Sequence, residues 1–160
     1  MGQILVDDST IGVQGLDAVY PTWLVNFIDV YQQLGLNNLQ LLKTVYHQNV
    51  TFIDPIHHVN GLTSLLVYFD NLYTNVGFCD FKIDDVFTTD GQASIYWTMS
   101  YSHKRLNSAQ PIQVQGHSLL KMADDKVIYH RDYVDLGAML YEHIPLLGKV
   151  IRTIKARASQ

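Results

Sequence analysis

The spacing of apolar residues changes partway along the chain, and this change limits the fold more than any other feature of the sequence. Up to Tyr73, apolar residues recur every three or four positions, which is the period of an amphipathic helix. From Phe81 onward they recur at every second position, which is the period of a strand with one buried face. The sequence therefore predicts helices in the first half of the chain and a sheet in the second.

The first half also contains one short strand. Residues 49–54 are rich in β-forming side chains, and Pro55 ends the strand because proline lacks the N–H that a central ladder needs. The expected helices run over residues 21–35, from Asn37 or Asn38 to Tyr46, and over residues 62–73.

Four long strands are expected in the second half. Asp90-Gly91 is a strong hairpin signal, and Asp135 is placed to cap a final helix that begins at Leu136. The alternation assigns Trp97, Met99 and Tyr101 to one inward face, and Ser118 to the inward face of the next strand. The strands are expected around Phe81 and Ile83 and over residues 93–101, 112–122 and 127–134.

This order of elements predicts an α+β fold in which a curved antiparallel sheet forms a cone. Three N-terminal helices cover the concave face, and a C-terminal helix follows the last strand. A pocket is expected inside the cone. The expected divisions are an N-terminal arm (1–20), the main domain (21–145) and a basic C-terminal helix or tail (146–160).

The composition of the chain argues against several classes of function. The chain has 160 residues, a formal net charge of −4 and no apolar run near 18 residues, so neither nucleic-acid binding nor a membrane span is expected. Cys79 is the only cysteine, which precludes an intrachain disulfide and fits a cytoplasmic setting. Four cations and no acid follow Glu142. We expect a solvated terminal helix there, with binding to anionic lipid as the less favoured alternative.

Two segments resemble those of a known superfamily. Residues 51–55 resemble the ketosteroid isomerase strand in which an aspartate before proline shuttles protons, and residues 126–135 resemble the last strand of limonene-epoxide hydrolases. Together with the element order, they make the chain similar to SnoaL-like polyketide cyclases within the nuclear-transport-factor-2-like, cystatin-like fold. Two departures stand out: Ser118 replaces the second isomerase acid, and Trp97 and Met99 replace the hydrolase Arg/Asp pair.

Three side chains are candidates for acid–base catalysis. Asp54 is expected to face the pocket, although an Asp-Pro turn that caps backbone donors is the alternative. His130 and Asp132 lie two apart on a strand and therefore share a face. The resemblance favours an inward face for this pair, whereas the opposite register would turn Tyr129, Arg131 and Tyr133 inward. His57 is expected at the pocket mouth, and no metal is expected.

The resulting interpretation is a cofactor-independent isomerase, cyclase or hydrolase that acts on a small hydrophobic compound. A non-catalytic binding protein and a protein-interaction module are the alternatives. The outer sheet face, which includes His117, is expected to form a homodimer. The candidate ligand-binding residues are Phe52, His57, Phe69, Tyr73, Trp97, Met99, Tyr101 and Ser118, some of which could equally be core.

Overall fold

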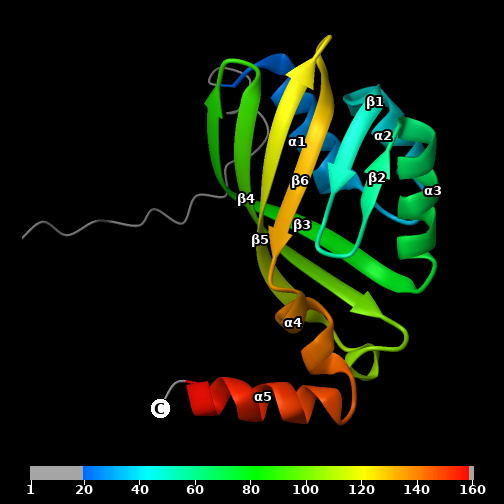
Figure 1. Cartoon of the computed structure of the whole chain (residues 1–160). Helices are drawn as coiled ribbons and strands as arrows, with labels where there is room; N and C mark the ends of the chain where they lie inside the picture. Colours follow the sequence, from blue (N-terminus) through cyan, green and yellow to red (C-terminus); the bar gives the residue numbers. More distant parts are fainter. Residues whose placement is uncertain (1–19, 159–160) are drawn as a thin grey trace, which may run out of the picture.

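The computed structural model describes residues 20–158 and shows one curved sheet with helices against it (Figure 1). The N-terminal arm expected over residues 1–20 therefore lies almost wholly outside the described residues. The helices are α1 (Thr22–Gln33), α2 (Leu42–Val45), α3 (Leu62–Tyr73), α4 (Leu136–Met139) and α5 (Leu147–Ala158). The strands are β1 (Tyr46–Ile53), β2 (His58–Asn60), β3 (Val76–Thr89), β4 (Gln92–His103), β5 (Ile112–Ala123) and β6 (Lys126–Val134).

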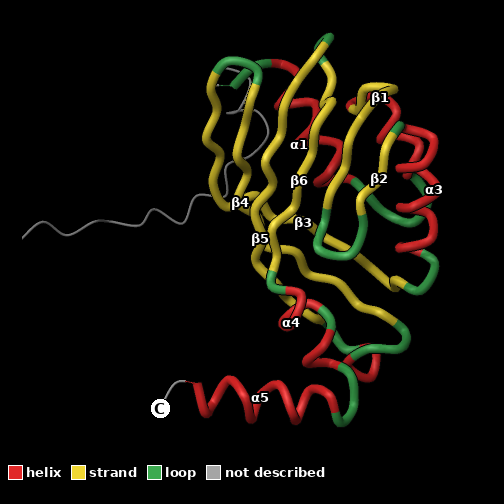
Figure 2. Tube along the Cα trace, viewed as in Figure 1, coloured by secondary structure: helices red, strands yellow, loops and turns green. Residues whose placement is uncertain are grey.

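The six strands form a single open sheet in the order β2-β1-β6-β5-β4-β3. All neighbours are antiparallel except β1 and β6, which run parallel. The predicted four-strand meander is thus β3 to β6, and the early strand joins its open edge beside β6. Figure 2 shows the strands curling around the helical side of the molecule. The predicted α+β cone is confirmed, with one parallel pair that the sequence pattern did not indicate.

Helices α1 and α3 cover the concave side of the sheet. Helix α1 packs on β3 and β6, and α3 packs on β1. Trp97 lies directly over Gly116, where an added Cβ would sit 2.1 Å from the indole ring, so only glycine permits this approach. Fully buried side chains complete the core, among them Leu24, Ile28, Leu65, Ile95, Leu120 and Val127.

Two element boundaries differ from the prediction. The expected second helix is a 3₁₀ turn (Leu39–Leu41) followed by the single turn of α2, and Tyr46, which was assigned to that helix, is the first residue of β1. The expected final helix is interrupted after α4 by a 3₁₀ turn (Tyr141–His143), and Pro145 keeps Ile144 extended before α5 begins. Asp135 caps α4 as predicted, accepting hydrogen bonds from the backbone N–H groups of Gly137 and Ala138.

Candidate active site

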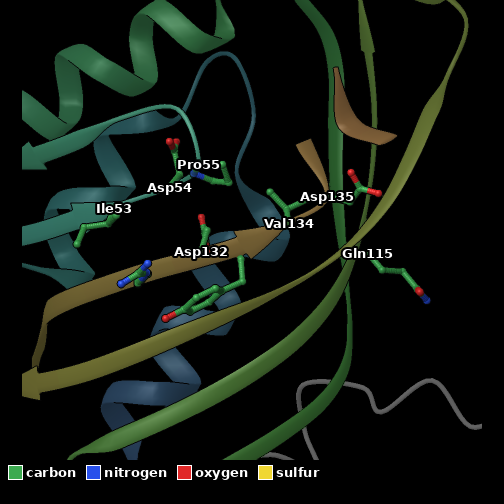
Figure 3. A pocket seen from close by; sticks show the side chains of 9 residues that line it. Ile53, Asp54, Pro55, Gln115, Asp132, Val134 and Asp135 are labelled. Carbon is green, nitrogen blue, oxygen red and sulfur yellow. The ribbon is translucent and has the colours of Figure 1, made fainter. Parts of the chain in front are cut away.

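A pocket opens where β1 stops and β6 continues. The last pair between these strands is Ile53 with Arg131, because Pro55 follows and the chain turns away. Beyond that pair, no strand of the described residues pairs with β6 on this side, and an open pocket of about 530 Å³ remains. Figure 3 shows Asp54 and Asp132 on its two sides. The pocket is lined by Ile53, Asp54, Pro55, Gln115, Arg131, Asp132, Tyr133, Val134 and Asp135.

Asp132 is held from the protein interior through one carboxylate oxygen. Its Oδ1 atom accepts hydrogen bonds from Nε2 of His130 at 2.7 Å and from Oγ of Ser118 at 2.5 Å. The indole N–H of Trp97 donates in turn to Ser118 Oγ at 2.8 Å. The side chain of Asp132 is 20% exposed. Every hydrogen bond that the described residues make to this carboxylate reaches Oδ1, so Oδ2 is available to the pocket.

His130 connects Asp132 to a buried chain of hydroxyl groups. The ring is 1% exposed, and its Nδ1 atom lies 2.5 Å from the hydroxyl of Tyr46, which is 2.5 Å from the hydroxyl of Tyr31. Burial is the main reason why the pKa of both tyrosines is raised well above the ordinary value, so both stay neutral donors. With Nε2–H donating to Asp132, neutral His130 accepts the Tyr46 proton at Nδ1. In this tautomer, His130 links the Asp132 carboxylate to the Tyr46 hydroxyl.

Asp54 lines the same pocket, but both of its oxygens have protein partners. Oδ1 accepts the backbone N–H groups of Ile56 and His57, each at 2.7 Å, and Oδ2 accepts the hydroxyl of Tyr68. Burial, together with this hydrogen bond to Asp54, raises the pKa of Tyr68, which keeps the phenol protonated. The carboxylate therefore caps the Asp-Pro turn, which was the alternative that the sequence left open, while it also borders the pocket.

The predicted aromatic wall lies in the core. Phe52, Phe69 and Trp97 belong to the main hydrophobic cluster, and none of the aromatic candidates borders the 530 Å³ pocket. His57 is exposed beside the ring of Tyr68, at 4.8 Å between ring centroids. Ser118 is buried and bonded to Asp132. Tyr73 and Tyr101 are buried as well, and Met99 is half-buried.

The structure adds three tyrosines that the sequence analysis did not connect with the site: Tyr31, Tyr46 and Tyr68. Tyr31 lies within the predicted first helix, and Tyr46 was assigned to the predicted second helix although it begins β1. One available signal was the chemistry of tyrosine itself, because a buried hydroxyl needs a partner and the chain also buries a histidine. That signal does not identify the partner, since Tyr46 and His130 are 84 positions apart.

Other reactive groups do not form a second centre in the described part of the chain. Residues 20–158 contain no group of three or more His, Cys, Asp or Glu side chains placed to hold a metal ion. Cys79 is half-buried, and desolvation of its thiol raises the pKa to about 11, which suppresses the nucleophilic thiolate. None of the described helices is long and apolar enough to cross a membrane.

Comparison with known families places this geometry in context. The family model of the SnoaL-like domain matches residues 27–130, which is most of the chain. The chain belongs to the SnoaL-like family. The match ends at His130, so Asp132 lies two residues beyond it. A search of the curated proteins gave no match.

Solved structures share the fold at low sequence identity. A Jannaschia protein provisionally named a SnoaL-like polyketide cyclase is 16% identical, with a TM-score of 0.68, over 91% of this chain and 99% of that one. A Catenulispora acidiphila protein with a ketosteroid-isomerase-like fold, solved with trimethylamine, is 15% identical, with a TM-score of 0.68, over 79% and 96%. A Mycobacterium tuberculosis epoxide hydrolase of the limonene-epoxide-hydrolase type is 14% identical, with a TM-score of 0.59, over 73% and 83%. These likenesses show the fold alone.

Proposed function

We propose that this SnoaL-like protein is a small-molecule enzyme that moves a proton with Asp132 as the base. One observation carries the proposal: Oδ1 of Asp132 is fixed by His130 and Ser118, while Oδ2 is left for the pocket. A carboxylate that is oriented from behind and partly shielded from water is suited to general base catalysis. The substrate class is a small, mainly apolar carbonyl compound, since Ile53, Pro55 and Val134 supply apolar lining.

The proposed step needs no cofactor. Oδ2 of Asp132 takes a proton from the carbon next to the carbonyl, and the electron pair moves to the carbonyl oxygen. His130 and Ser118 hold the carboxylate, and the hydroxyls of Tyr46 and Tyr31 keep the imidazole in place. Gln115 and Arg131 also border the pocket, but they alternate along their strands with inward-facing Gly116 and Asp132 and so point to the outer face of the sheet, where Arg131 lies over the ring of Tyr133. Asp54 borders the substrate from the opposite side.

Deuterium uptake tests this proposal without knowledge of the natural substrate. Small apolar ketones and enones are incubated with the protein in D₂O, and exchange at the carbon next to the carbonyl is followed by NMR. We expect catalysed exchange in at least one compound and its loss in Asp132→Asn. Exchange that persists in Asp132→Asn would remove the carboxylate from the proposed role.

A non-catalytic binding protein is the second candidate, and the position of the Ser118 hydrogen favours it. The Ser118 hydroxyl donates to Asp132, so this candidate ligand-binding residue has no hydrogen left to donate to a substrate oxygen. A binding protein would show a ligand-induced rise in melting temperature with no deuterium uptake in the same compounds. An enzyme would show both.

We also infer that the outer sheet face pairs two copies of the chain. Tyr96 and Tyr133 are about half exposed there and sandwich His117, whose buried Nε2 atom has no hydrogen-bond partner among residues 20–158. Such a mixed aromatic and polar face is typical of an interface. Light scattering tests the inference: Tyr96→Glu should turn a dimer into a monomer, and a monomeric parent protein would contradict it.

A further inference from the structure

Helix α5 contacts the rest of the chain through its polar side. Arg152 donates to the backbone oxygen of Glu142 at 3.1 Å, and Lys155 binds the carboxylates of Glu142 and Asp135. Gly148 lies so close to the Glu142 backbone that an added Cβ would sit 2.1 Å from its oxygen. Figure 1 shows α5 standing apart from the sheet, connected to it through the region of α4.

No residue within 20–158 covers the apolar side of α5. Its members recur at intervals of three and four residues and occupy one stripe, yet Leu147, Val150 and Ile154 are 41%, 53% and 60% exposed. An amphipathic helix of a globular protein normally turns such a stripe toward its own core. Here the polar contacts hold the stripe outward. The stripe comprises Leu147, Val150, Ile151, Ile154 and Ala158, and Leu146 (76% exposed) extends it at its N-terminal end.

The charge around the stripe has one sign. All four Lys and Arg residues after Glu142 lie on α5, and no Asp or Glu follows, although the remainder of the chain has only seven cations against fifteen acids. On a helical wheel, the cations occupy the face opposite the stripe and its two borders. A partner that covers the stripe must therefore combine an apolar interior with negative charge at its edge. The four cations are Lys149, Arg152, Lys155 and Arg157.

We propose that α5 binds the surface of an anionic lipid bilayer, with its apolar stripe in the outer acyl region. A bilayer offers apolar depth below a layer of negative headgroups, and Lys and Arg stems can extend from the stripe to that layer. Pairing with α5 of a second copy would bring eight cations together, which disfavours that occupant. The sequence favoured a merely solvated helix, and the outward stripe is what changes the interpretation. This proposal does not depend on the chemistry proposed for Asp132.

Flotation of the 160-residue chain with vesicles tests the proposal. The vesicles contain phosphatidylcholine alone or phosphatidylcholine mixed with phosphatidylglycerol. We expect binding to the mixed vesicles, weak binding to the neutral ones, and release as salt screens the charges. The double variant Val150→Ser/Ile154→Ser should lower partitioning by about tenfold or more. Lys149→Gln/Arg157→Gln should lower it by roughly fivefold for each cation removed.

A matched variant on the polar side controls for changes in the helix itself. Thr153→Ser/Ala156→Ser places the same residue type on α5 away from the stripe and should bind vesicles like the parent protein. Circular dichroism checks that all variants keep their helix content. Equal binding by the stripe variant and the parent would overturn the proposal, as would equal binding to neutral and anionic vesicles. Loss of a dimer in the stripe variant, without any vesicle binding by the parent, would show that a second copy covers the stripe.

Discussion

Two aspartates face one pocket, yet the protein holds them in different ways. Asp54 receives backbone N–H groups on one oxygen and the Tyr68 hydroxyl on the other. Asp132 receives side chains on a single oxygen, and its second oxygen is left to the pocket. The role that a carboxylate can play in a pocket therefore depends on which of its oxygens already accept hydrogen bonds from the protein. The first aspartate caps the turn, and the second keeps one oxygen without a protein hydrogen bond among the described residues, as the proposed base requires.

The difference originates in the strands that carry the two residues. Asp54 is the first residue after β1, where a chain that meets Pro55 must turn and its backbone donors need acceptors. Asp132 lies within β6, where its backbone pairs with Ser118 on β5 and its side chain is free to meet the interior. At the end of a strand, the carboxylate of Asp54 accepts hydrogen bonds from the turn. Within a strand, the carboxylate of Asp132 keeps one oxygen without such a bond.

The largest expected effect separates the two aspartates by rate. Asp132→Asn removes the proposed base, so deuterium exchange should fall by about two to four orders of magnitude. Asp54→Asn keeps an acceptor oxygen for the turn and should change the rate by less than about tenfold. Exchange rates from NMR decide the matter, with melting temperatures as a check on folding. A larger loss in Asp54→Asn than in Asp132→Asn would reverse the comparison.

The next effect concerns stability and the support of Asp132. His130→Ala removes a buried ring and takes one hydrogen-bond partner from each of Tyr46 and Asp132, which should lower the free energy of unfolding by about 3 kcal/mol. His57→Ala is the matched control, because His57 is exposed and supports Asp54 through its backbone N–H. It should change stability by less than about 0.5 kcal/mol. Urea denaturation measures the free energy of unfolding of both variants. An equal loss in the two would mean that the buried hydrogen bonds of Tyr31, Tyr46 and His130 add no stability beyond that of an exposed side chain.

The support that Asp54 gives to its turn predicts a smaller loss. Asp54→Ala leaves two backbone donors and the Tyr68 hydroxyl without their acceptor, so stability should fall by about 1–2 kcal/mol. Asp54→Asn should recover part of that loss because its amide oxygen still accepts. A series in urea tests this order, and an alanine variant as stable as the parent protein would show that the turn holds without its cap.

The smallest effect is a dependence on alkaline pH. Burial raises the pKa of Tyr31 and Tyr46, and that of the Cys79 thiol to about 11, so these groups release protons more readily once unfolded. Their contribution is present in full below the pKa values of the unfolded chain and declines as pH rises through that range. We expect a loss below about 1 kcal/mol at pH 9 and a steeper one above pH 10, measured by thermal unfolding. Constant stability across that range would contradict the buried, neutral state of these groups.

The sequence predicted the sheet better than it predicted the site. Alternation correctly placed Trp97 and Ser118 on inward faces, because residue parity on a strand is a local property. Tyr46 was misplaced because its apolar ring satisfied the helical period as well as the strand that begins there. The pocket could not be located because it depends on a parallel contact between β1 and β6, two strands whose pairing residues are 78 positions apart at Ile53 and Arg131. Aromatic residues that could wall a pocket or fill a core look identical in sequence, and here they fill the core.

Covalent labelling tests most directly whether Asp132, rather than Asp54, presents a reactive carboxylate oxygen to the pocket. A small apolar epoxide esterifies carboxylates that present an accessible oxygen, and peptide mass spectrometry reports which aspartate has reacted. Asp132 should be labelled first and in large excess over Asp54, with the reaction slowed when a small apolar ketone occupies the pocket. Labelling of Asp54 at a rate equal to or above that of Asp132 would contradict the account.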